Sequence, residues 1–238
     1  MKNKKIIAMI PARIGSQRLP KKNLALLGGK PLIYYAIDAA KKSNVFDRIV
    51  INSDSEIFKK ISERYNVEFY HRPKNYGSSN TKSDEVIFNF MENHPADILV
   101  WVNSIAPLQK SEEIREVVEF FIKKDYDSLI TVKNENVHCV MDGKPVNYNP
   151  DELFAKTQDL KPVQPFVYSL MMWKYETFMK DFEKKGYALL SGKIGFYSVG
   201  KMSSIIIKTD DDLRFAEYVL TGFKEKGNYK IRYDKLAD

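Results

Sequence analysis

The chain has 238 residues, of which 44% are hydrophobic, and a formal net charge of +7 at pH 7. This composition is typical of a folded globular domain and excludes a disordered or fibrous chain. Cys139, the single cysteine, excludes an intrachain disulfide and a cysteine-based zinc cluster, and it fits a reducing compartment. The apolar run before Pro11 is too short for a signal sequence or a membrane span. We expect a cytoplasmic protein without a membrane partner.

The positive charge does not by itself predict nucleic-acid binding. The lysines are scattered over predicted helix faces, with pairs such as Lys41–Lys42 and Lys184–Lys185, and such pairs are usually solvated. No basic stripe with interleaved aromatic residues occurs, so we expect no nucleic-acid partner. A basic surface also attracts nucleotides and acidic sugars.

Strands and amphipathic helices alternate along the first 132 residues. Short apolar runs predict strands at residues 6–10, 48–53, 67–70, 97–103 and 128–132. Helical spacing predicts helices from Pro31 and at residues 55–65, 83–91 and 111–121. This alternation is typical of a doubly wound, mostly parallel sheet. We therefore predict a Rossmann-like α/β fold in a single domain of residues 1–238.

The alternation stops after residue 132. Residues 134–168 contain the prolines 145, 150, 162 and 165 and little apolar periodicity. An irregular segment of this length is usually functional or an interface, so we predict an excursion from the domain. Strands at 168–173, 194–199 and 204–208 are expected next, with helices at 175–182 and from Thr209 to about residue 220.

The stretch after the first predicted strand gathers positive charge. Pro11 has no N–H for a sheet and should end the strand. The cations Arg13, Arg18, Lys21 and Lys22 then surround Gly15 and Ser16. A buried strand that opens into a basic loop with a glycine is a common phosphate site of α/β proteins. The alternative is a solvated basic loop. The stretch has neither a Walker motif nor a dinucleotide glycine motif.

This stretch also resembles a known family. Its letters I-P-A-R-x-G-S-x-R-L-P-x-K-N are similar to the complete N-terminal signature of the acylneuraminate cytidylyltransferases, the CMP-sugar synthetases. The resemblance implies a Rossmann-like nucleotidyltransferase that activates an acidic 2-keto-3-deoxy sugar, a sialic-acid-like nonulosonic acid or a relative, with CTP. CMP-sugar and pyrophosphate would be the products. It also implies a homodimer in which residues 134–168 reach over the partner subunit and cover the substrate.

Transfer of a cytidylyl group depends mainly on positioning and on cations that stabilise charge on the phosphate oxygens. Arg13, with its forked donors, and Lys22, a mobile point charge, are the predicted catalytic residues. The resemblance implies a further substrate-binding set: Ala12, Gly15, Ser16, Arg18, Asn23, Arg72, Ser83 and Asn103. For Arg18 the alternative is a solvated side chain, and for Arg72 it is a surface arginine after an edge strand.

The sequence departs from the family's pattern at functional positions. Asn103 stands where the family has a glutamine, which leaves the substrate open because the amide is kept but shortened. Lys208 stands where the family has an aspartate that binds Mg²⁺, and Ile206 replaces the other acidic residue. Mg²⁺ is still the expected cofactor, with Asp210 as a candidate ligand. The alternative is that the aspartates at 210–212 form the acidic first turn of a helix.

These departures leave further functions open. One alternative is a nucleotidyltransferase of the same fold with a different acceptor, which Asn103 and the aromatic residues of the excursion would suit. Another is a catalytically silent nucleotide-binding paralogue, which Lys208 and Ile206 would suit. CTP binding and pyrophosphate release with acid sugars would distinguish them.

Overall fold

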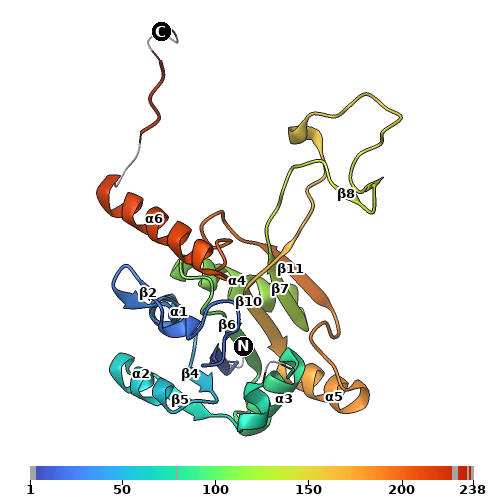
Figure 1. The fold of residues 1–238 in the computed structure, drawn as a ribbon. Coiled ribbons are helices and arrows are strands. Elements are labelled where there is room, and N and C mark those ends of the chain that lie inside the picture. Colours follow the sequence, from blue (N-terminus) through green and yellow to red (C-terminus); the bar gives the residue numbers. More distant parts are fainter. Residues whose placement is uncertain (1–3, 79, 227–229, 235, 237–238) are drawn as a thin grey trace.

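The structure, a computed structural model, describes residues 4–78, 80–226, 230–234 and 236. A seven-stranded sheet with the order β11-β7-β10-β6-β1-β4-β5 forms its centre (Figure 1). Only β10 runs antiparallel to its neighbours, β6 and β7. The strands are β1 (Ile6–Ala12), β4 (Arg48–Ser53), β5 (Glu68–His71), β6 (Ile98–Val102), β7 (Ser128–Val132), β10 (Phe166–Lys174) and β11 (Ile194–Ser198). The predicted mostly parallel sheet is confirmed.

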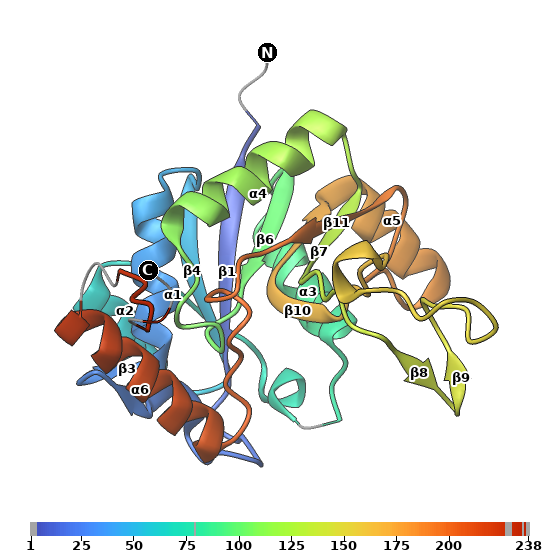
Figure 2. The ribbon, with the colours of Figure 1, turned by 90° about the horizontal axis from the view of Figure 1, so that it is seen from above.

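Helices cover both faces of the sheet (Figure 2). One face carries α1 (Leu32–Ser43), α2 (Ile57–Tyr65) and α4 (Ser111–Lys124), and the other carries α3 (Ser83–Asn93) and α5 (Tyr175–Lys185). Residues of β1 alternate between the two cores: Ala8 and Ile10 pack in the first, and Ile7 and Met9 in the second. The strand is buried on both faces, as its continuous apolar run predicts.

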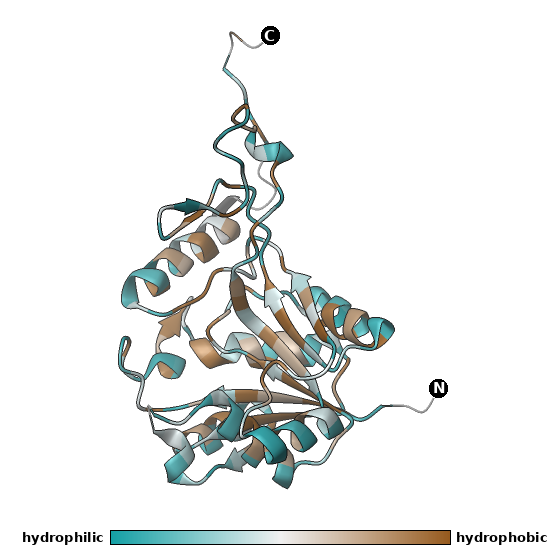
Figure 3. Cartoon of the chain, turned by 90° about the vertical axis from the view of Figure 1, so that its right-hand side faces the viewer, coloured by the Kyte–Doolittle hydropathy of each residue, from teal (hydrophilic) through white to brown (hydrophobic). Residues whose placement is uncertain are grey.

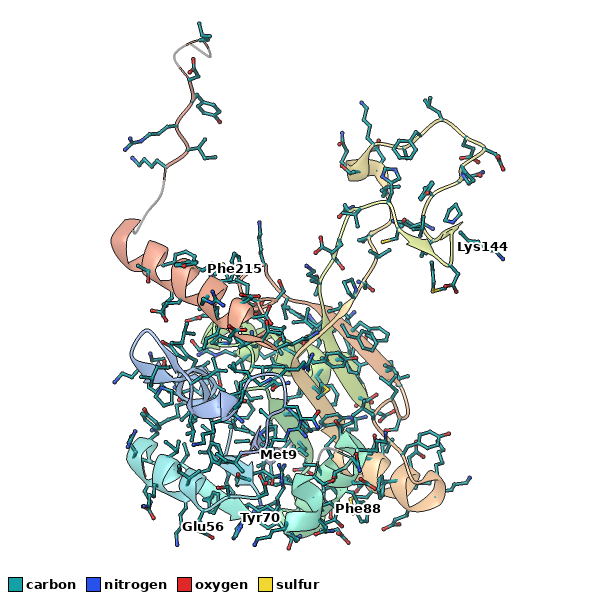
Figure 4. All side chains as sticks on the ribbon, viewed as in Figure 1. Met9, Glu56, Tyr70, Phe88, Lys144 and Phe215 are labelled. Atoms are coloured by element: carbon teal, nitrogen blue, oxygen red, sulfur yellow. The ribbon has the colours of Figure 1, made fainter. Side chains whose placement is uncertain are left out.

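The last helix, α6 (Asp210–Lys226), lies outside these two layers. Its Ala216 packs with Leu27 and Leu32 in a small separate core, together with Ile207 of the preceding segment. Leu27 belongs to the short hairpin of β2 (Leu26–Leu27) and β3 (Lys30–Pro31). Figure 4 shows Phe215 on α6, well away from Met9 in the sheet. In the described part of the chain, no helix is both long and apolar enough to span a membrane.

Pro11 does not end the first strand. The strand continues to Ala12, and Pro11 pairs with Asn52 of β4. On the other side, β6 pairs with β1 only as far as Met9. The missing N–H of Pro11 therefore faces no third strand that would need it.

The predicted strand at residues 204–208 is also wrong, because this segment is a turn followed by irregular chain. Ile207 is fully buried, but it packs against Leu27 and Leu32 rather than in the sheet. Its N–H donates to the carbonyl of Ile105 at 2.8 Å, which is a single bond and not a ladder. A short apolar run can thus contribute a buried side chain without forming a β-strand.

The irregular segment projects from the sheet between β7 and β10, and we call residues 134–165 the arm (Figure 1). It contains a small hairpin of β8 (Val140–Met141) and β9 (Lys144–Pro145), and η3 (Thr157–Asp159) follows. A bridge between Glu135 and Val163 joins the two legs of the arm. In Figure 3 the hydrophobic colour is concentrated in the sheet and on the adjoining helix faces, whereas the arm is largely hydrophilic.

Candidate active site

A cavity of about 370 Å³ lies where β1 and β6 end. This is the edge of an open α/β sheet at which ligands usually bind. Its lining includes the predicted residues Ala12, Arg13, Ser16, Lys22, Asn23, Arg72, Ser83 and Asn103. Three separate segments, after β1, β5 and β6, thus meet at one place, and we call this space the first cavity.

Lys22 lies in the electropositive part of the first cavity. Its ammonium donates to the carbonyl oxygen of Ile207 at 3.2 Å. Burial lowers the pKa of Lys22 below its ordinary value, and the positive charges of Arg18 and Arg13 lower it further. Cations held this close in a partly buried site favour an anion between them, and phosphate oxygens would relieve their mutual repulsion.

Arg72 is only 4% exposed, so the alternative of a surface arginine is wrong. Its guanidinium lies 3.6 Å from Asp54 (Nη2 to Oδ1), and its Nε has no hydrogen-bond partner among the described residues. Burial lowers the pKa of Arg72, although Asp54 opposes that change. Arg72 lines the first cavity, and a guanidinium in a cavity wall is suited to an anionic ligand.

Asn23 ties together the loops after β1 and β6. Its Oδ1 accepts a 2.6 Å hydrogen bond from Ser104 Oγ, and its Nδ2 donates to the carbonyl of Arg13 at 3.5 Å. The residue is 4% exposed. Asn23 therefore holds Arg13 and Ser104 in place, whatever contact it also makes to a ligand.

The amide of Asn103 is oriented by the backbone around it. Its Nδ2 donates to the carbonyl of Tyr168 at 3.1 Å, and its Oδ1 accepts from the N–H of Ile105 at 3.4 Å. Tyr168 has a left-handed backbone conformation (φ 58°) where the register of β10 against β7 shifts. With these bonds in place, one Nδ2 hydrogen of Asn103 remains for a ligand.

A second cavity of about 540 Å³ lies between the base of the arm, residues 201–208 and α6. Its lining combines lysines with apolar and aromatic residues: Lys133, Lys201, Lys208, Phe166, Ile205 and Phe215. Lys133 forms an ion pair with Glu135. The two cavities adjoin, because Ile207 bonds to Ile105 and Lys22 of the first cavity and lies next to Lys208 of the second.

Comparison with known proteins agrees with this geometry. A family model described as Cytidylyltransferase matches residues 7–218. The chain belongs to this family. It is 27% identical to the N-acylneuraminate cytidylyltransferase of Streptococcus agalactiae serotype V, over 98% of this chain and 59% of that relative. It is 34% identical to the pseudaminic acid cytidylyltransferase of Campylobacter jejuni serotype O:2, over 52% of this chain and 54% of that relative. It thus spans about three-fifths of the length of the streptococcal cytidylyltransferase.

Solved structures resemble this cytidylyltransferase chain in fold. One is a CMP:2-keto-3-deoxy-manno-octonic acid synthetase in complex with CTP, with a TM-score of 0.69 at 12% identity, covering 91% of this chain and 98% of that one. Another is the 4-diphosphocytidyl-2C-methyl-D-erythritol synthase of Anaerococcus prevotii, with a TM-score of 0.63 at 17% identity, covering 92% of this chain and 100% of that one. These likenesses support the Rossmann-like nucleotidyltransferase fold.

Some predicted residues lie outside the cavity lining. Gly15 is exposed, and a Cβ added there would meet nothing within 4 Å. Arg18 is exposed too, but its charge reaches Lys22. Asp210 pairs with Arg214 at 2.8 Å on the exposed first turn of α6. The assignments of Gly15 and Asp210 to ligand binding stay predictions.

Other lining residues carried no clear signal in the sequence. Tyr76, Ser78, Trp101 and Ser104 also line the first cavity. Tyr76 belongs to η2 (Lys74–Gly77), which folds back toward β4. A Cβ at Gly77 would lie 2.5 Å from Asp54 Oδ2, so the absence of a side chain permits this approach. Gly77 was therefore the one sequence feature that could have indicated that this loop packs closely against Asp54.

The residues present do not fit a Mg²⁺ ion held by the protein. No carboxylate lines the first cavity in the described part of the chain. Asp212, which lines the second cavity, accepts hydrogen bonds from the N–H groups of Lys208 and Thr209, both at 2.8 Å. Burial opposes ionisation of Asp212, but these bonds prevail and hold its pKa below the usual range. Among the described residues, no three Asp, Glu, His or Cys side chains group as metal ligands.

Proposed function

We propose that the protein is a CTP-dependent cytidylyltransferase that converts an acidic 2-keto-3-deoxy sugar to its CMP form and releases pyrophosphate. The observation that carries this proposal is the meeting of Arg13, Lys22 and Arg72 in one cavity at the end of β1. Membership of the cytidylyltransferase family supports CTP as the nucleotide. The relatives named for acylneuraminate and pseudaminic acid support a nonulosonic acid as the acceptor.

In this reaction a hydroxyl oxygen of the sugar attacks the α-phosphorus of CTP. The bond between that phosphorus and the pyrophosphate oxygen breaks, and the hydroxyl proton passes to solvent. Negative charge builds on the phosphate oxygens, where Arg13 and Lys22 stabilise it. Arg72 adds a fixed guanidinium, and the free Nδ2 hydrogen of Asn103 orients the substrate.

The second cavity is the proposed place of the sugar. It adjoins the first cavity through Ile207, so an acceptor there would lie beside the nucleotide. Lys201 has no ion-pair partner among the described residues, and it is suited to the sugar's carboxylate. Phe166 offers an apolar wall for the less polar face of the ring.

We infer that the arm contacts a second copy of the chain. Leu153 is 97% exposed and Phe154 is 68% exposed, although Phe154 also stacks on His138 with 4.0 Å between ring centroids. Apolar side chains held out by an ordered arm are suited to an interface. Sedimentation of the wild type and of Leu153→Glu tests this. A dimer that Leu153→Glu dissociates is expected, and a monomeric wild type would contradict it.

The proposed function is tested by pyrophosphate release. CTP is mixed with a panel of acceptors that includes sialic acid, pseudaminic acid and 2-keto-3-deoxy-octonic acid, and the panel is repeated with UTP. Release with CTP and an acid sugar is expected, and Lys22→Met should abolish it.

Two other outcomes have defined meanings. If pyrophosphate is released only with neutral or phosphorylated acceptors, the acceptor is not an acid sugar. Asn103 would suit such a different acceptor. CTP binding with no release from any acceptor would favour the silent paralogue.

A further inference from the structure

Lys208 lines the second cavity close to where that cavity adjoins the first. Ile207, the residue before it, accepts a hydrogen bond from Lys22 through its carbonyl. The charge of Lys208 also contributes to the lowered pKa of Lys22, so the two ammonium groups lie within electrostatic reach. Lys208 lines the second cavity, and its neighbour Ile207 joins that cavity to Lys22 of the first, so its ammonium lies beside the nucleotide cavity.

The backbone at Lys208 is fixed. Asp212 Oδ2 accepts from the N–H groups of Lys208 and Thr209, and Thr209 Oγ1 accepts from the N–H of Asp212 at 3.3 Å. This reciprocal arrangement is a capping box that starts α6. The Asp212 carboxylate, which lines the second cavity, is thus occupied by hydrogen bonds to the backbone. The side chain of Lys208 is exposed and has no ion-pair partner among the described residues.

Triphosphate chemistry needs positive charge beside the phosphates, and a divalent ion commonly supplies part of it. Here the first cavity offers cations and no carboxylate within the described residues. We propose that the ammonium of Lys208 replaces a protein-held Mg²⁺ beside the triphosphate. This inference rests on the proposed function, because it concerns the same nucleotide. Any Mg²⁺ present would then be carried by the nucleotide's own phosphates, and CTP would bind this protein without it.

The test is calorimetric titration of CTP into the protein in EDTA and in MgCl₂. The variants are Lys208→Ala, which removes the charge, and Lys208→Asp, which installs a carboxylate. Lys180→Asp on α5 makes the same charge change at an exposed site outside both cavities. Thermal unfolding followed by circular dichroism shows whether each variant is folded. The cap bonds at residue 208 use its backbone N–H, which the substitutions keep.

The wild type should bind CTP equally well in EDTA and in MgCl₂, within about threefold, since fixed ammonium groups supply the countercharge. Lys208→Ala should weaken binding in EDTA about tenfold, as expected for loss of one charge-assisted contact. Lys208→Asp should weaken it about 100-fold in EDTA and recover at least about tenfold with Mg²⁺, because a carboxylate beside a triphosphate ligates that ion. Lys180→Asp should match the wild type.

The contrary results separate this inference from the function beneath it. Wild-type CTP binding that strengthens tenfold or more with Mg²⁺ would overturn the role of Lys208 and leave the cytidylyltransferase standing. The same holds if Lys208→Ala binds CTP like the wild type in EDTA. No CTP binding under either condition would overturn the proposed function itself.

Discussion

The loop after β1 and the segment before α6 meet at one edge of the sheet but differ in character. The loop carries the complete signature of its family, and the structure gathers Arg13, Lys22 and Asn23 around one cavity. The segment before α6 has Ile206 and Lys208 where acids are expected, and its nearest carboxylate, Asp212, is consumed by the helix cap. Under the proposed function, the loop therefore binds the nucleotide and the segment before α6 supplies part of its countercharge.

The largest expected effect comes from removing one cation of the loop after β1. Lys22→Met keeps most of the side-chain volume but removes the ammonium from the middle of the cation group. CTP affinity should fall about 100-fold, as expected for a lost charged hydrogen bond in a partly buried site. Calorimetry in EDTA measures it, with Lys180→Met as the matched control. A loss below threefold would show that the triphosphate lies elsewhere.

Arg72, a cation of the first cavity, is also expected to stabilise the fold. Arg72→Met leaves Asp54 without its cation in a poorly exposed position. We expect a loss of about 3 kcal/mol in the free energy of unfolding, the low end of the range for removing one partner of a buried ion pair, because the two groups lie 3.6 Å apart. Urea denaturation measures it. The double variant Arg72→Met/Asp54→Asn should recover part of the loss, and additive losses would contradict the pairing.

The pH dependence of CTP binding comes next. Burial, with Arg18 and Arg13, lowers the pKa of Lys22, so this lysine loses its proton at a lower pH than an ordinary lysine does. Phosphate binds the charged form, so affinity is full below that pKa and falls, by at most about tenfold per pH unit, as the pH rises through it. Arg18→Ala removes one of the charges and should move the fall to higher pH. An unshifted curve would contradict the coupling.

Asn103 should give the smallest effect on nucleotide binding. Asn103→Gln lengthens the side chain by one methylene and disturbs its bonds to Tyr168 and Ile105. CTP affinity should change by less than about threefold, because neutral amide contacts are worth little net free energy. The order of preferred acceptors in the pyrophosphate assay should change instead, because Asn103 bonds to Ile105, and Ile105 bonds to Ile207 beside the second cavity. A large loss of CTP affinity with unchanged acceptor preference would place Asn103 on the nucleotide.

Much of the fold could be predicted because the strands are buried on both faces. The run Ile6–Ile10 reads as apolar throughout, and the helices that follow each strand have clear apolar faces. The parallel order then brings the residues after β1, β5 and β6 to one edge, which is why Arg13, Arg72 and Asn103 were predictable as neighbours.

Other features depend on tertiary contacts that a local pattern does not encode. The isoleucines at 205–207 have the composition of a strand, but Ile207 is buried against Leu27 and Leu32 of a distant hairpin. Tyr76 and Trp101 reach the first cavity through loop and packing geometry. Gly15 was predicted from its position in the motif to bind the ligand, but it is exposed and does not line the cavity.

The most direct test of the account is nucleotide selectivity. CTP, UTP, ATP and GTP are titrated in turn into the wild type and into Lys22→Met, in EDTA. The account predicts that the wild type binds CTP in preference to the other three and that Lys22→Met loses this binding. Equal affinity for all four nucleotides, or CTP binding that Lys22→Met leaves intact, would contradict a cytidine nucleotide site at the end of β1.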